Sequence, residues 1–202
     1  MGKPNKILNK ILNKRKATVK KHTKKKKTRR KLKRGGNKSK CEIFVIDHNN
    51  FAEYQKMLEG LQMCDTDYIS PNLEEMTYDV LEYEGNMGFF CRDPISNKIS
   101  SVLCVDLNSN ENLPPSVMNN LANSNATSTA EIMLLCSSKT NRVPGATRDL
   151  FDKVMKYLAS IKKQHIYLRV AKPSTNKRAI DFYQSLGFTM LKENGLMMLT
   201  LS

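Results

Sequence analysis

The sequence has no tryptophan, only three histidines, and no Asp or Glu among its first 40 residues. His22, His48 and His165 are far apart, and the five cysteines show no Cys-x-x-Cys spacing. This pattern argues against a zinc site and against a disulfide framework, and it fits a reducing compartment. We therefore expect an intracellular protein whose chemistry needs no metal.

Long apolar runs are also missing. No stretch approaches the ~18 apolar residues that a membrane-spanning helix needs, and the start of the chain is too charged for a signal peptide. We expect no membrane span.

Charge divides the chain into two parts. Residues 1–40 contain 19 of the 34 Lys and Arg, so the rest has 15 basic and 19 acidic side chains, a net charge of −4. Like charges repel and offer little apolar surface to bury, which predicts a largely disordered basic tail over 1–40. Residues 41–202 are expected to form one mildly acidic domain.

The tail leaves several functions open. Counterion release would bind it to nucleic acid without sequence preference, while nuclear import and an anionic membrane surface are alternatives. A solvated tail without a specific partner is the simplest reading. Its composition resembles the basic tails of proteins from large DNA viruses, which implies a nuclear or virion location.

Hydrophobic periodicity and turn residues predict the elements of the domain. Strands are expected at 41–47, in a hairpin over 87–107, and at 130–137, 165–171 and a closing hairpin over 188–202. Helices are expected at 49–63, 70–83, 145–163 and 174–188. The Asn/Ser/Pro-rich residues 108–129 are expected to be a long loop. The order β-α-α-β-β-β-α-β-α-β-β predicts an α/β sheet with helices on both faces.

A candidate anion site follows the strand at 130–137. The segment "SKTNRVPGATRDL" leads through Gly145 into a helix, and the amides of a helix N-terminus favour an anion such as phosphate.

Two motifs resemble the GNAT superfamily of acetyl-CoA-dependent N-acetyltransferases. The family's loop Gln/Arg-x-x-Gly-x-Gly/Ala is matched by Arg142, Gly145 and Thr147. Its later, more specific motif is matched at Asn176, Ala179, Phe182, Tyr183, Gly187 and Phe188. The resemblance covers most of residues 41–202 and implies a mostly antiparallel sheet.

The resemblance also implies roles for particular residues. Glu131 would be the general base and Tyr183 the acid that protonates the leaving thiolate, with Tyr183 and Asn176 also contacting acetyl-CoA. The backbone of Leu135, Cys136 and Ser137 would pair with pantetheine. Pyrophosphate contacts would come from the loop and helix start at Arg142, Val143, Gly145, Ala146, Thr147 and Arg148.

Each of these residues also has a simpler reading. Glu131 would be a solvent-facing strand residue, Tyr183 a packed aromatic residue and Asn176 a helix cap. Thr147 departs from the family pattern, because a β-branched residue replaces a small one and could crowd the cofactor. A degenerate enzyme is therefore a second reading.

The acceptor is expected to be a cation. Residues 57–91 contain eight acids and no basic residue: Glu59, Asp65, Asp67, Glu74, Glu75, Asp79, Glu82 and Glu84. An acidic acceptor side would attract a polyamine, a lysine side chain or a protein N-terminus. We thus expect direct acetyl transfer to an amine in a ternary complex. The alternative is a non-catalytic nucleic-acid-binding or packaging protein that acts through residues 1–40.

Overall fold

The computed structural model describes residues 41–58, 81–109, 113–121 and 126–201. The chain divides into two units, Met1–Asn37 and Lys38–Ser202. The basic tail and six of the eight acids of 57–91 lie outside the described residues, and so does most of the second expected helix. Within the described residues, no helix is long and apolar enough to cross a membrane.

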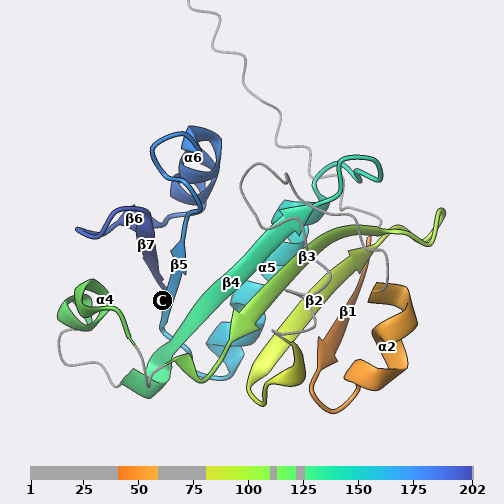
Figure 1. Ribbon diagram of the computed structural model, residues 1–202, viewed down its shortest axis with the longest axis horizontal. Helices are drawn as coiled ribbons and strands as arrows, with labels where there is room; N and C mark the ends of the chain where they lie inside the picture. Colours follow the sequence, from red (N-terminus) through yellow and green to blue (C-terminus); the bar gives the residue numbers. More distant parts are fainter. Residues whose placement is uncertain (1–40, 59–80, 110–112, 122–125, 202) are drawn as a thin grey trace, which may run out of the picture. The chain divides into compact units, whose positions relative to one another are not determined.

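A seven-stranded sheet forms the centre of the domain, in the order β1-β2-β3-β4-β5-β7-β6 (Figure 1). Neighbouring strands are antiparallel except β4 and β5, which are parallel. The strands are β1 Glu42–Asp47, β2 Asn86–Arg92, β3 Ile99–Asp106, β4 Thr129–Ser137, β5 His165–Arg169, β6 Thr189–Met190 and β7 Leu196–Thr200. The predicted fold class is confirmed.

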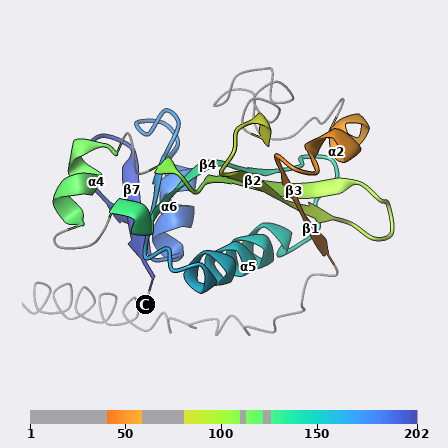
Figure 2. The same cartoon turned by 90° about the horizontal axis from the view of Figure 1, so that it is seen from below.

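Helices lie on both faces of this sheet. Figure 2 shows α2 and α5 on opposite sides of the sheet. Their bounds, with those of the other helices, are α2 Phe51–Leu58, α4 Pro115–Asn120, η2 Ala126–Ser128, α5 Ala146–Ser160 and α6 Lys177–Ser185. The apolar face predicted for α5 is buried, with Leu150, Val154 and Leu158 all at 0% exposure.

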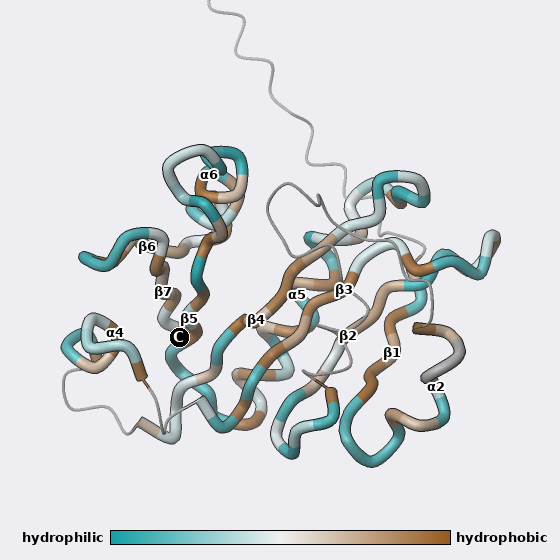
Figure 3. The backbone as a smooth tube through the Cα atoms, in the orientation of Figure 1, coloured by the Kyte–Doolittle hydropathy of each residue, from teal (hydrophilic) through white to brown (hydrophobic). Residues whose placement is uncertain are grey.

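Two apolar clusters, one on each face, hold these layers together. On the α5 face, Leu103 and Val105 of β3 pack with Ile132 of β4 and with the helix. On the α2 face, Val102 and Cys104 pack with neighbours from β2, β4 and α2. Because β3 is covered on both sides, its central residues 102–105 form an unbroken apolar run (Figure 3).

The connection between β3 and β4 differs from the expected loop. It contains α4, a short helix whose Val117 and Leu121 are buried against Tyr167, Leu196 and Met198. Pro115 begins the helix, where its missing N–H costs no hydrogen bond. The hydrophobic pattern of this segment is too short to predict a helix from sequence. Two buried apolar residues, Val117 and Leu121, lie four residues apart and anchor it to the sheet.

The expectation of no disulfide was also wrong. Cys41 and Cys91 are joined by a disulfide, with their Cα atoms 5.6 Å apart. They meet because β1 and β2 pair antiparallel with Ile43 opposite Cys91, a contact that sequence spacing does not show. Cys104 is a buried free thiol, and burial raises its pKa to about 12.

The docking of α4 can be tested with two adjacent residues. Val117 is fully buried, whereas Met118 is 59% exposed. Val117→Ala should lower the free energy of unfolding by about 2 kcal/mol through lost burial and the cavity left behind. Met118→Ala should change it by less than about 0.5 kcal/mol. Urea unfolding measures both, and equal effects would show that α4 is not packed on the sheet.

Candidate active site

Strands β4 and β5 pair only over their first residues and then separate. Their register runs from Thr129 opposite His165 to Ile132 opposite Leu168. Beyond Ile132, β4 continues to Ser137 and pairs with β3 alone among the described residues. Figure 1 shows the two strands diverging along this length. We call residues 133–137 of β4 the open edge.

The open edge has backbone groups available for a ligand. The amide of Ser138 donates to the carbonyl of Ser100 on β3 at 2.8 Å. Because backbone groups alternate along a strand, Cys136 also directs its N–H and C=O to β3, while Leu135 and Ser137 direct theirs away from it. The predicted pantetheine contacts therefore narrow to Leu135 and Ser137, which have the geometry to pair with an extended chain.

The loop after β4 brings a helix N-terminus to the same end of the strand. Gly145 precedes α5 with φ +84°, and a Cβ added there would meet no atom within 4 Å. Several of the predicted donors already have acceptors within the protein: the amide of Val143 donates to Ser100 Oγ of β3, Ala146 to the Val143 carbonyl, and Arg148 to the Gly145 carbonyl. Among the described residues, the amides of Gly145 and Thr147 have no acceptor. These two are the candidate phosphate donors.

The Thr147 hydroxyl does not point toward the candidate phosphate site at the Gly145 and Thr147 amides. Its Oγ1 lies 3.0 Å from the Oγ of Ser101 on β3. Ser101 is fully buried. The side chain is therefore held against the sheet, which removes the physical reason for expecting it to crowd a cofactor. Arg142 and Arg148 are both exposed at this end of the molecule and add positive charge for an anion.

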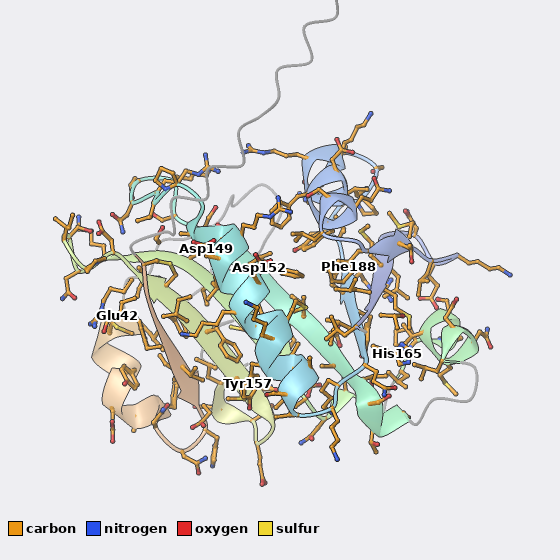
Figure 4. The ribbon with its side chains drawn as sticks, turned by 180° about the vertical axis from the view of Figure 1, so that it is seen from behind. Glu42, Asp149, Asp152, Tyr157, His165 and Phe188 are labelled. Atoms are coloured by element: carbon orange, nitrogen blue, oxygen red, sulfur yellow. A yellow bond between two sulfur atoms is a disulfide. The ribbon has the colours of Figure 1, made fainter. Side chains whose placement is uncertain are left out.

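Asn176 and Tyr183 belong to α6. The Asn176 side chain accepts a hydrogen bond from the Ala179 amide at 3.3 Å, so it caps the helix. The Tyr183 ring packs edge-on against Phe182 and Phe188, and Figure 4 shows Phe188 on the face covered by α5 and α6. Burial raises the pKa of Tyr183 to about 12, so its hydroxyl remains protonated at neutral pH.

Glu131 lies on β4 one residue before the last β4–β5 pair. Its carboxylate accepts a hydrogen bond from the Tyr167 hydroxyl, with Oε2 at 3.1 Å. Burial raises the pKa of Glu131, the nearby Asp106 raises it further, and Tyr167 and Arg169 act in the opposite direction. A raised pKa makes this carboxylate a stronger base than an exposed glutamate, as a general base requires.

The two candidate catalytic residues face opposite sides of the sheet. Tyr183 packs with the cluster under α5, whereas Glu131 contacts Tyr167, whose neighbours are on the α4 side. β4 and β5 separate directly after the Ile132–Leu168 pair, next to Glu131. Side chains from both faces of the sheet can therefore reach a molecule bound at the open edge.

Sequence reasoning missed Tyr167. Tyr167 is the central residue of β5. It reaches the Glu131 carboxylate because the parallel register places Tyr167 opposite Glu131. The strand pattern could have assigned its face, but not its partner.

Glu131→Gln should make the folded protein more stable at neutral pH. Because the folded pKa is raised, the native state binds more protons than the unfolded state between the unfolded and folded values, so stability falls as pH rises through that window. Glutamine is neutral at every pH and keeps an acceptor for Tyr167. The gain should be present at pH 8 and absent at pH 4, as measured by denaturant unfolding. The exposed Glu84→Gln is the control, and a gain of the same size there would contradict the assignment.

Comparison with known proteins identifies the fold. No family model matches the sequence. No curated protein matches it either. Among solved structures, Gcn5 from Tetrahymena is similar with a TM-score of 0.53 at 12% identity, covering 80% of this chain and 96% of that one. A GCN5-related N-acetyltransferase from Kribbella flavida gives 0.50 at 12% identity, covering 80% and 98%. The described part of residues 41–202 has the fold of the GNAT N-acetyltransferases.

Proposed function

We propose that this protein is an N-acetyltransferase that moves an acetyl group from acetyl-CoA to a primary amine. The observation that carries the proposal is the open edge of β4 beside the start of α5. Leu135 and Ser137 offer strand-like pairing there, and Gly145 and Thr147 offer two amides to an anion. Pantetheine amides and a pyrophosphate are the chemical groups that match these donors and acceptors.

Each residue then has a defined task. Acetyl-CoA supplies an acetyl group activated as a thioester. Glu131 accepts a proton from the ammonium form of the acceptor, so that the amine nitrogen can bond to the acetyl carbon as the carbon–sulfur bond breaks. Amides of the open edge donate toward the carbonyl oxygen. Tyr183 gives its proton to the departing thiolate, the second proton that the nitrogen loses as the amide forms restores the Tyr183 hydroxyl, and transfer is direct within a ternary complex.

The acceptor in this proposal is a cationic amine. Asp106 lies opposite Glu131 in the β3–β4 register, and two adjacent carboxylates attract a cation. Glu82 and Glu84 are exposed, and the other acids of 57–91 lie outside the described residues. A polyamine, a lysine side chain and a protein N-terminus all fit this charge, as do the tail's own lysines.

Acetyl transfer is tested by thiol release from acetyl-CoA with the full chain. The acceptors are a polyamine, a lysine peptide and a basic N-terminal peptide. Glu131→Gln should lower kcat by about 10²-fold or more and Tyr183→Phe by roughly 10-fold or more, because each removes one proton transfer. The exposed Asp152→Asn on α5, outside the acids assigned to the acceptor side, should leave kcat unchanged. Full turnover in both active-site variants would show that the assigned roles are wrong.

The charge of residues 1–40 favours a second activity, binding of nucleic acid. With 19 Lys and Arg and no acid, the tail should bind duplex DNA through its phosphates. Affinity should fall by about 10³-fold or more between about 50 and about 200 mM salt. Removal of residues 1–40 should abolish this binding. Fluorescence anisotropy measures it, and affinity that is indifferent to the deletion or to salt would exclude the tail as the binding element.

A further inference from the structure

The hydrogen bond between Tyr167 and Glu131 connects two adjacent strands at the point where they begin to separate. The Tyr167 hydroxyl donates to Glu131 Oε2 at 3.1 Å. The residues are direct partners in the β4–β5 register. No described residue donates to the other carboxylate oxygen, Oε1. The carboxylate is therefore held by one oxygen while the second can accept a proton.

The Tyr167 ring is fixed by its surroundings. It is 2% exposed and packs against Val117 of α4 and Leu196 and Met198 of β7. Such packing leaves the ring little freedom of rotation. Burial raises the pKa of the Tyr167 hydroxyl, so it remains a donor at neutral pH.

The position of α4 depends in turn on the carboxylate of Glu193, which is distant in sequence but contacts the helix directly. Glu193, between β6 and β7, accepts a hydrogen bond from the Ser116 amide at 3.1 Å and another from the Ser116 hydroxyl. Its other oxygen pairs with Arg169 of β5 at 3.2 Å. One residue therefore ties the start of α4 to the end of the strand that carries Tyr167.

The groups around Glu131 explain why this hydrogen bond matters. Asp106 on β3 faces it and disfavours its charge, while Arg169 on β5 favours it. The helix α4 and strand β7 have no titratable side chain. The Tyr167 hydroxyl is thus the only neutral donor that the described residues direct at this carboxylate.

We propose that Tyr167 is a positioning residue for Glu131: it orients the carboxylate, keeps Oε1 available to the acceptor amine, and stabilises the charged form. This inference rests on the proposed function, because it assigns a partner to the proposed base. A hydroxyl that stabilises the carboxylate lowers the pKa at which the base becomes active.

The test is Tyr167→Phe, which removes one oxygen and keeps the buried ring. Tyr157→Phe is the matched control, because the one described partner of its hydroxyl is the Met87 sulfur, at 3.2 Å. Two quantities are measured on the full chain. The first is the titration of Glu131 followed by carboxyl-carbon NMR, assigned with Glu131→Gln. The second is the pH dependence of kcat/KM.

Tyr167→Phe should move the Glu131 titration and the acidic limb of the rate profile upward by about one pH unit. On the acidic limb of the profile, activity should fall roughly tenfold and recover as the pH is raised, which a simple loss of structure would not do. The control should move neither quantity. An unmoved titration in Tyr167→Phe would overturn the inference even if the enzyme is active. A moved titration without acetyl transfer by the native protein would sustain the hydrogen bond's role and reject the proposed function instead.

Discussion

The short parallel pairing of β4 with β5 is the constraint on which the rest of the site depends. β5 has five residues and β4 has nine, so β4 must extend past its partner. β3 pairs with β4 over this length and holds it in the sheet, so that its other edge is left open. A longer β5 would use the same backbone groups for sheet hydrogen bonds, and no position for an extended ligand would remain.

A bulge in β4 makes this edge chemically useful. The register changes between Cys104 and Val105 of β3, which face Leu134 and Ile132, so Met133 is the extra residue. The bulge reverses the alternation of faces. Before it Glu131 faces away from α5. After it Ser137 lies opposite Ser101, the residue that holds Thr147. One inserted residue therefore allows a single strand to contribute a base on one face and support the phosphate-side helix on the other.

The sequence predicted what depends on local pattern. The buried stripe of α5 follows from its spacing. Helix capping was one of the two readings that the residue type left open for Asn176. The predicted closing hairpin turns at Gly195, where φ is +79°. The features it missed depend on contacts between distant segments. The Cys41–Cys91 disulfide needs the β1–β2 pairing, and the Tyr167–Glu131 hydrogen bond needs the parallel register. Neither has a local signal.

The helix α4 illustrates how strongly such contacts can decide local structure. Six residues are too few to form a stable helix alone, so its stability comes from Val117 and Leu121 in the sheet-side cluster and from Glu193 at its first turn. Its place is consequently set by contacts with β5 and the β6–β7 hairpin and not by its own helix propensity. Because α4 packs on Tyr167 and Tyr167 holds Glu131, a change in the hairpin reaches the proposed base through three contacts. The connection between β3 and β4 is therefore part of the site's architecture, although none of its described residues has a role in the proposed chemistry.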